Sequence, residues 1–179
     1  MLLEGRMAVV TGGSRGIGFQ IAKILLEEGA RVLAVSRSTE NLADAKQALP
    51  DLETLAADTA NADEIDAVVS DVSARWGSLD ILVNNAGMWI GDHADVVAGE
   101  DHEFADTLHT NLFGPYLCTK RFLPLLLAGS DPRIVNVGST SGVLAPKLRS
   151  VYGVSKLALH GLTIATANEL AGRVAVNAL

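Results

Sequence analysis

Two ionisable side chains, Tyr152 and Lys156, stand four residues apart in the stretch Val-Tyr-Gly-Val-Ser-Lys. In a helix this spacing places both side chains on one face, one turn apart. A phenol can donate a proton, and an ammonium group at about 4 Å stabilises the resulting phenolate by about 4 kcal/mol at an effective dielectric constant of about 20. The pair is therefore either a proton donor with a tuning cation or an ordinary surface pair, and the choice depends on the rest of the chain.

A glycine-rich stretch lies near the amino terminus, in Thr-Gly-Gly-Ser-Arg-Gly-Ile-Gly at 11–18. It follows a short apolar run and precedes a helical pattern, which is the context that a dinucleotide-binding loop requires. Glycines permit a tight turn and let the backbone approach a pyrophosphate, while the helix offers unpaired amides to the phosphates. A flexible turn is the alternative, but the context favours a dinucleotide. The expected contacts are Gly12, Ser14, Arg15, Gly16, Ile17 and Gly18.

The residues after the second apolar run indicate which dinucleotide is preferred. An acidic residue at this position usually binds the unphosphorylated ribose of NAD(H). Here the run ends in Ser36 and Arg37, and Arg15 in the glycine loop could reach the same place. Guanidinium groups pair bidentately with phosphate, so the sequence predicts NADP(H) in preference to NAD(H). The alternative is a pair of solvated surface arginines.

Two further clusters follow later predicted strands. Asp58 could accept a hydrogen bond from an adenine amino group, or it could serve as a cap beside the next helix, and the pattern leaves both open. The stretch Asn-Asn-Ala-Gly at 84–87 would be an ordinary turn if it stood alone. Beside a glycine loop, its small residues let the backbone lie against a ribose or nicotinamide. Asn85, Ala86 and Gly87 are therefore expected to contact the cofactor.

The elements that must position these residues alternate in type along the chain. Short β-branched runs predict strands at 7–11, 31–36, 54–57, 79–83, 133–137 and 173–179. Amphipathic runs predict helices at 16–28, 39–49, 62–76, 100–127 and 152–171, with Asn61 and Gly77 at the two ends of the third. This order predicts a single α/β domain over 1–179, a Rossmann-type doubly wound parallel sheet. In such sheets the functional crevice lies at the carboxyl ends of the strands.

Composition excludes several classes of protein. Hydrophobic residues make up 49% of the chain and charged residues 20%, which is a globular balance. The net charge of −7 argues against nucleic-acid binding, and the single cysteine, Cys118, excludes an intrachain disulfide. No apolar run approaches the roughly 20 residues of a membrane span, and no signal peptide is recognised, so we expect a cytoplasmic protein. The four histidines are His93, His102, His109 and His160, and no two of them have the spacing of a metal-ligand pair. The sequence therefore predicts no metal site.

Taken together, the motifs carry a resemblance that covers nearly the whole chain. The glycine loop, the Asn-Asn-Ala-Gly stretch, Asn111, Ser139 and the Tyr152/Lys156 pair occur in the order found in the short-chain dehydrogenase/reductase superfamily. The chain is most similar to 3-oxoacyl-carrier-protein reductases and related ketone or alcohol oxidoreductases. The separation of Ser139 from Tyr152 also fits this family. The resemblance implies an NADPH-dependent enzyme that transfers hydride between the nicotinamide and a ketone or secondary alcohol.

The resemblance also implies a role for each motif residue. Tyr152 would be the general acid that protonates the ketone oxygen, and Lys156 would supply the cation and bind the cofactor ribose. Ser139, chosen over the neighbouring Thr140 and Ser141 by its spacing to Tyr152, would hold the substrate carbonyl oxygen. Asn111 would anchor a water that links Lys156 to solvent. A local kink is expected at Asn111 because Gly-Pro follows at 114–115.

The chain departs from the family pattern at Leu179, where family members continue into a segment that covers the substrate. We therefore expect that the natural polypeptide is longer and that this sequence is incomplete at its carboxyl end. The alternative function is a truncated, catalytically poor nucleotide-binding or association module. The resemblance further implies a homodimer or homotetramer formed through 100–127 and 152–171, where the run Leu-Pro-Leu-Leu-Leu at 123–127 offers apolar surface. Tryptophans such as Trp76 and Trp89 are more often packing residues, and of the two only Trp89, just after the Asn-Asn-Ala-Gly stretch, could line a substrate cleft.

Overall fold

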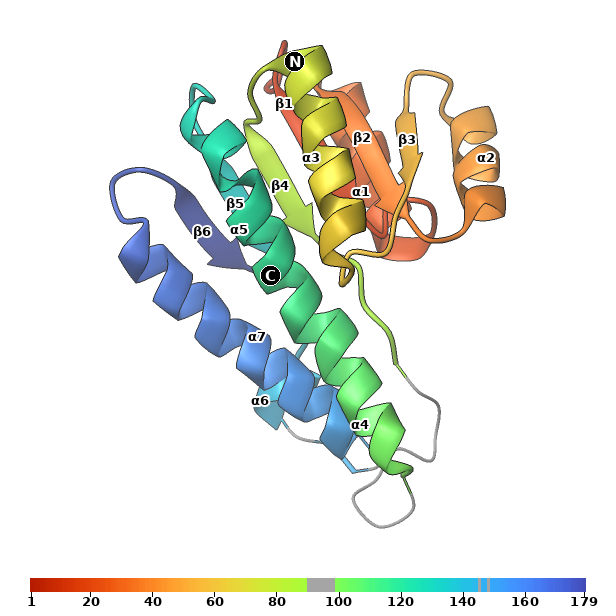
Figure 1. The fold of residues 1–179 in the computed structure, drawn as a ribbon, viewed down its shortest axis with the longest axis vertical. Coiled ribbons are helices and arrows are strands. Elements are labelled where there is room, and N and C mark those ends of the chain that lie inside the picture. Colours follow the sequence, from red (N-terminus) through yellow and green to blue (C-terminus); the bar gives the residue numbers. More distant parts are fainter. Residues whose placement is uncertain (90–98, 145, 148) are drawn as a thin grey trace.

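The structure is a computed structural model, and it describes residues 1–89, 99–144, 146–147 and 149–179. Its centre is a six-stranded sheet with the order β3-β2-β1-β4-β5-β6, in which every neighbouring pair of strands is parallel. Helices cover this sheet (Figure 1). The order reverses direction between β1 and β4, which is the switch point where α/β sheets place their ligands. The predicted α/β class and the doubly wound parallel sheet are confirmed.

The strands are β1 (Met7–Thr11), β2 (Arg31–Ser36), β3 (Glu53–Ala56), β4 (Ile81–Asn84), β5 (Arg133–Asn136) and β6 (Ala175–Ala178). The helices are α1 (Gly16–Glu27), α2 (Thr39–Ala48), α3 (Ala62–Trp76), α4 (Asp101–Leu108), η1 (His109–Phe113), α5 (Gly114–Leu127), α6 (Ser141–Leu144) and α7 (Ser150–Glu169). All predicted ends of strands and helices lie within two residues of the observed ends. The sequence did not predict the short helix α6.

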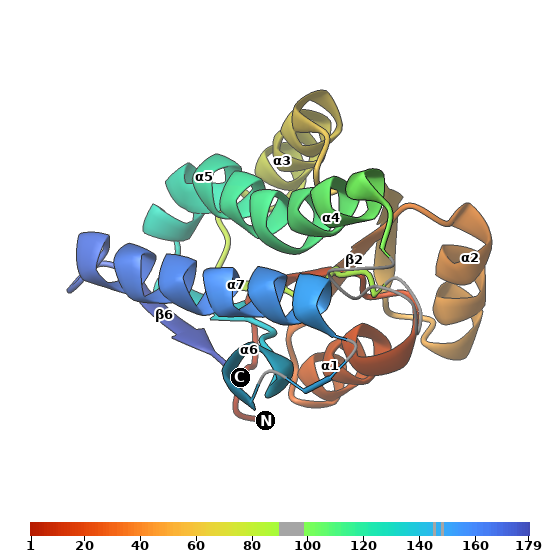
Figure 2. The same ribbon diagram turned by 90° about the horizontal axis from the view of Figure 1, so that it is seen from below.

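Two apolar clusters hold the helices to the two faces of the sheet. One joins α1 and α2 to the sheet through buried residues such as Ala22 and Leu42. The other joins α3 and α5 to the opposite face and includes Phe122, which is fully buried. The view from below shows α3, α4, α5 and α7 on one side and α1 on the other (Figure 2). Because helices cover the strands, β1, β2 and β4 read as continuous apolar runs rather than as alternating ones.

The predicted helix at 100–127 is continuous but contains a π-helical turn, η1, at its centre. Pro115 has no N–H group, so it cannot donate to the carbonyl of Asn111 as an α-helix would require. The N–H of Gly114 instead donates to the carbonyl of His109, five residues earlier. The predicted kink is therefore a widened turn. Asn111 lies in this turn and is fully buried.

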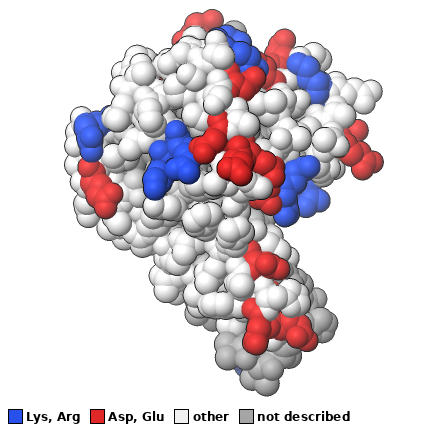
Figure 3. Space-filling model, in the orientation of Figure 1, with Lys and Arg blue, Asp and Glu red and all other residues white. Residues whose placement is uncertain are grey.

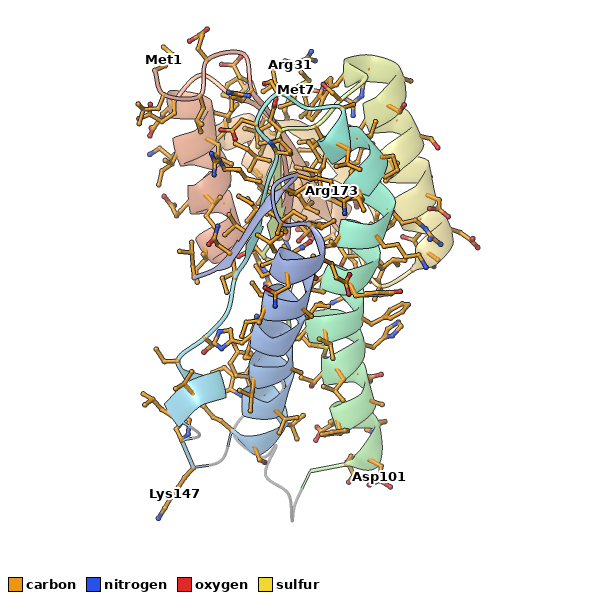
Figure 4. The ribbon with its side chains drawn as sticks, turned by 90° about the vertical axis from the view of Figure 1, so that its left-hand side faces the viewer. Met1, Met7, Arg31, Asp101, Lys147 and Arg173 are labelled. Carbon is orange, nitrogen blue, oxygen red and sulfur yellow. The ribbon has the colours of Figure 1, made fainter. Side chains whose placement is uncertain are left out.

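The helices α4 and α7 run alongside one another and extend past the carboxyl edge of the sheet (Figure 4). On the face shown in Figure 3, acidic side chains gather on this projection. Asp101 and Glu103 in the first turn of α4 contribute to this charge, which also suits the positive end of the helix dipole. Over the described residues, no helix combines the length and the apolar character that crossing a membrane would require.

Candidate active site

A cavity of about 300 Å³ opens at the carboxyl ends of β1, β2 and β4. It is lined by residues that the sequence had predicted as cofactor contacts, from the glycine loop, the end of β2, the segment after β3 and the Asn-Asn-Ala-Gly stretch. These are Gly12, Ser14, Arg15, Gly16, Ile17, Gly18, Ser36, Arg37, Asp58, Asn85, Ala86 and Gly87. The cavity is also lined by four residues that were not predicted from the sequence, Val35, Ala57, Thr59 and Thr110. Each of them stands within two residues of a predicted contact or at the end of a strand.

The glycines shape this cavity in different ways. Gly12 and Gly16 have φ angles of +64° and +56°, which residues with a Cβ rarely adopt. A Cβ added at Gly16 would point into open space, so the loop is open to solvent at this residue. A Cβ at Gly18 would collide with the carbonyl of Gly12, so glycine is needed for α1 to pack against the loop. The backbone is thereby open towards a ligand on one side and tightly packed on the other.

Asn85 holds the glycine loop in place. Its side-chain amide donates to the carbonyl oxygens of Thr11 and Gly12, at 2.9 and 3.2 Å. The hydroxyl of Thr11 accepts hydrogen bonds from the N–H groups of Asn85 and Ala86, both at 3.0 Å. These bonds join residues more than seventy positions apart. Asn85 therefore lines the cavity and also positions the loop opposite it.

The end of β2 places hydroxyl and guanidinium groups at one end of the cavity. The hydroxyl of Ser14 donates to that of Ser36 at 3.0 Å. Arg37 is exposed and lies 3.8 Å from Asp58, a long ion pair that water weakens. The other oxygen of Asp58 accepts a hydrogen bond from the N–H of Ala60 at 2.9 Å, so this carboxylate closes a local turn before α3 while it also lines the cavity, and the cap of α3 is Asn61.

Asn111 connects the Asn-Asn-Ala-Gly segment to α7. Its side-chain oxygen accepts from the N–H of Met88 at 2.7 Å, and its amide donates to the Met88 carbonyl at 2.9 Å. The same amide donates to the hydroxyl of Ser155 at 3.0 Å, and this hydroxyl donates to the carbonyl of Tyr152 at 2.7 Å. No role was predicted for Ser155, although its position one helical turn after Tyr152 places the two residues on the same face of α7. The predicted water site at Asn111 stays a prediction.

Lys156 is buried with its ammonium group directed towards the cavity residues. Its Nζ donates to the carbonyl of Val137 at 2.7 Å, just past the end of β5. A Cβ built on Gly87 would lie 3.7 Å from this Nζ. Burial, which disfavours the charged form, lowers the pKa of Lys156 from 10.5 to about 8. The amine is therefore charged at neutral pH and becomes neutral more readily than a surface lysine.

Tyr152 lies within reach of this ammonium group. The Nζ of Lys156 is 5.8 Å from the centre of the Tyr152 ring, so the spacing in the sequence does bring the two groups together. The half-buried ring faces that of Trp89, with ring centres 6.4 Å apart and planes inclined by 45°. The hydroxyl of Ser139 accepts a hydrogen bond from the N–H of Ser141 at 3.1 Å, which fixes it at the start of α6. The helix α6 packs against α7, the helix that carries Tyr152.

No metal centre is present among the described residues, which hold no group of three His, Cys, Asp or Glu side chains suited to an ion. His102 lies in α4 and His109 begins η1, whereas His93 falls outside the described part of the chain. His160 lies in α7 beside Gly138.

A parallel sheet with this strand order and a glycine loop after its first strand is a Rossmann-type fold. The family model described as "short chain dehydrogenase" matches residues 6–179. The chain therefore belongs to the short-chain dehydrogenase family of oxidoreductases. Its membership confirms the resemblance recognised from the motifs.

Curated relatives share about a third of their residues with this chain. The 3-oxoacyl-acyl-carrier-protein reductase FabG of Vibrio cholerae is 35% identical over 99% of this chain and 72% of its own length. The rhamnolipids biosynthesis 3-oxoacyl-acyl-carrier-protein reductase of Pseudomonas aeruginosa is 39% identical, over 95% of this chain and 69% of its own. The chain thus spans about seven-tenths of the length of these relatives.

Solved structures agree with the fold. The RhlG/NADP active-site complex of Pseudomonas aeruginosa has a TM-score of 0.92 and 36% identity, and the match covers 98% of this chain and 72% of that one. Ligand-free aldohexose dehydrogenase from Thermoplasma acidophilum has a TM-score of 0.90 and 31% identity, and that match covers 98% of this chain and 66% of the other.

Proposed function

We propose that the chain is an NADPH-dependent reductase that interconverts a small ketone and a secondary alcohol, with Tyr152 as its general acid. One observation carries this proposal. The buried ammonium group of Lys156 faces both Gly87, which lines the cavity, and the ring of Tyr152. A cation in this position can bind a ribose hydroxyl and stabilise a phenolate at the same time.

The residues fit a dinucleotide. The cavity is lined by backbone with positive φ at Gly12 and Gly16, and α1 directs its first amides towards it. Ser14, Arg15 and Gly16 would hold the phosphates, and Asn85 would keep the loop in shape. The nicotinamide cofactor, when bound, supplies the hydride that reduces the carbonyl carbon.

The chain's own residues would manage the proton. Tyr152 would donate its hydroxyl proton to the ketone oxygen as that oxygen gains negative charge. The hydroxyl of Ser139 would bind the same oxygen and keep it within reach of Tyr152. Lys156 would stabilise the phenolate that remains. The bonds from Asn111 to Met88 and Ser155 would hold α7 against the cofactor segment, so that these groups stay aligned.

The preference for NADPH over NADH is supported by the end of β2. No carboxylate stands at this strand end, where Ser36 bonds to Ser14. Arg15 and Arg37 both line the cavity and are exposed, so their guanidinium groups are available to a 2′-phosphate. The Pseudomonas relative RhlG, solved as a complex with NADP, is consistent with this preference.

The test is ketone-dependent oxidation of NADPH by the parent protein and by Tyr152→Phe. We expect turnover in the parent and a loss of at least a hundredfold in the variant, since only the proton-donating hydroxyl is removed. Calorimetric affinity for NADPH should change less than threefold. Tyr116→Phe, at the chain's other tyrosine, which is exposed on α5, is the matched control and should retain turnover. Turnover in Tyr152→Phe within a few-fold of the parent would refute the proton-donor role. NADPH binding with no turnover in the parent would instead favour the nucleotide-binding module.

A further inference from the structure

Beside the candidate site, Arg149 lies against the aromatic pair formed by Trp89 and Tyr152. Its guanidinium carbon is 4.6 Å from the centre of the Trp89 ring. Since Trp89 is itself 6.4 Å from Tyr152, the guanidinium lies no farther from the Tyr152 ring than the sum of these distances, about 11 Å. Both Arg149 and Trp89 are exposed, so the surface beside Tyr152 carries a solvent-accessible cation.

The contact with Trp89 involves the guanidinium carbon of Arg149 over the ring and is not an ion pair. A guanidinium stacked on a ring uses its flat face, while its five N–H donors point outward in the plane. In that arrangement Trp89 would limit the orientations of the group and leave its donors free. This arrangement suits the two parallel hydrogen bonds that a carboxylate accepts.

A second arginine–tryptophan contact in the same protein gives a comparison. Arg31 and Arg75 both lie over the ring of Trp76, at 5.4 and 5.7 Å from its centre. Each of these guanidinium groups is paired with the carboxylate of Glu53. Among the ion pairs formed between described residues, none involves Arg149. The two arginines at Trp76 are thus already paired with a carboxylate of the protein, whereas Arg149 at Trp89 can still bind an anion.

We infer that Arg149 is a specificity residue that binds the carboxylate of a small keto acid while the ketone group lies at Tyr152. This inference rests on the proposed function. Because the guanidinium lies within about 11 Å of the Tyr152 ring, one small molecule can place its carboxylate at Arg149 and its ketone group at Tyr152. The net charge of −7 repels anions in general, so a local cation is needed for such a substrate to be selected.

The test compares keto acids with their neutral methyl esters. A series of methyl ketone acids that begins at levulinate and lengthens by one methylene at a time is titrated calorimetrically into the protein saturated with NADP⁺. The oxidised cofactor prevents reduction during the measurement. For at least one chain length we expect the acid to bind about tenfold or more tightly than its ester, as a charge-assisted bidentate contact allows. In Arg149→Gln the acid and its ester should bind with about equal affinity.

Lys147→Gln is the matched control because Lys147 is a nearby exposed cation whose side chain points away from the molecule (Figure 4). The preference for the acid should survive in this variant. Equal affinities for acids and esters, binding of neither, or a preference that persists in Arg149→Gln would each overturn the inference. Steady-state kinetics then separate the two proposals. Selective binding of the acids without their reduction by NADPH would refute the proposed function and leave the role of Arg149 in place.

Discussion

Lys156 illustrates how one buried side chain can be set for its chemical role. Within the part of the chain that the structure describes, its ammonium group makes one hydrogen bond, to the carbonyl of Val137, and the residue is buried. Enclosure disfavours the charged form and lowers the pKa of the amine to about 8. Burial of the charged amine therefore costs folding free energy. Its position near Tyr152 suits it to stabilise a phenolate rather than the fold.

The lowered pKa of Lys156 predicts how stability changes with pH. Between about pH 8 and 10.5 the unfolded chain binds the proton and the folded chain does not, so the free energy of unfolding rises with pH over this window. Relative to Lys156→Met, the parent should gain about 3 kcal/mol across it. Urea denaturation of both proteins at several pH values measures this difference.

The comparison of parent and variant also removes an opposing effect. Burial raises the pKa of Cys118 from 9.0 to about 12, so deprotonation of the unfolded thiol lowers stability above pH 9 in both proteins. A difference between parent and Lys156→Met that stays constant from pH 8 to 10.5 would show that the amine is not perturbed by burial.

Cofactor choice is predicted to depend on the side chains at the end of β2. In the double variant Ser36→Asp, Arg37→Gln, a carboxylate replaces a hydroxyl and one phosphate-binding guanidinium is lost. We expect the affinity for NADPH to fall at least tenfold and that for NADH to rise, because the new carboxylate repels a 2′-phosphate and accepts from a ribose hydroxyl.

Fluorescence titration with both reduced cofactors measures these affinities. Arg133→Gln, at the opposite end of the sheet, is the control and should leave both unchanged. Equal affinity of the parent for NADPH and NADH would count against the proposed preference.

Among the elements, α7 is coupled to the sheet by a buried polar network as well as by apolar contacts. The amide of Asn84 donates to the side-chain oxygen of Asn136 at 2.8 Å, and that of Asn136 donates to the hydroxyl of Thr163 at 2.9 Å. Thr163 completes the chain by donating to the carbonyl of Leu159 at 2.7 Å. The network ties the ends of β4 and β5 to the helix that carries Tyr152 and Lys156.

Breaking this network should destabilise the fold. Asn136→Ala leaves Asn84 and Thr163 each without one buried partner, and we expect a loss of about 2–4 kcal/mol in the free energy of unfolding. Asn177→Ala on the edge strand β6 is the control, since this exposed side chain should change stability by less than about 0.5 kcal/mol. Equal effects of the two substitutions in urea denaturation would show that the network contributes nothing particular.

At the scale of the whole molecule, the feature that bears on assembly is an exposed apolar surface on α4, η1 and α5. A groove there is lined by Ala105, Leu108, His109, Leu112, Phe113, Tyr116 and Leu162. Phe113 and Tyr116 are 39% and 43% exposed, which is high for aromatic side chains on one helical face. The run at 123–127 is a weaker candidate than its sequence suggested, because Leu125 and Leu126 belong to the core. We propose that two copies of the chain associate through this groove.

Self-association predicts a specific response to charge. Phe113→Glu places a carboxylate in the groove and should convert a dimer or tetramer to a monomer in light scattering. Ile24→Glu replaces an apolar residue of similar exposure on α1 and should leave the assembly intact. A parent protein that is monomeric at all workable concentrations would refute the association.

Much of this protein was determined by local patterns in its sequence. The alternation of short β-branched runs with longer amphipathic runs predicted the parallel sheet, and Asn61 and Gly77 marked the two ends of α3, because such signals act over a few residues. The spacing of Tyr152 and Lys156 likewise required only a helix to bring the two side chains together. The glycine loop was recognisable because it stands between a strand and a helix.

Other features depend on contacts between distant parts of the chain, so only the tertiary structure decided them. Asn85 restrains the glycine loop more than seventy residues away, and Lys156 owes its burial to the ends of neighbouring strands. The π-turn at Asn111 combines a local cause, Pro115, with bonds to Met88 that the local sequence does not show. Arg149 meets Trp89 across sixty positions that separate them in the sequence but not in space. Hydrophobic period and turn chemistry are properties of neighbours, whereas burial, charge environment and partner choice belong to the folded chain.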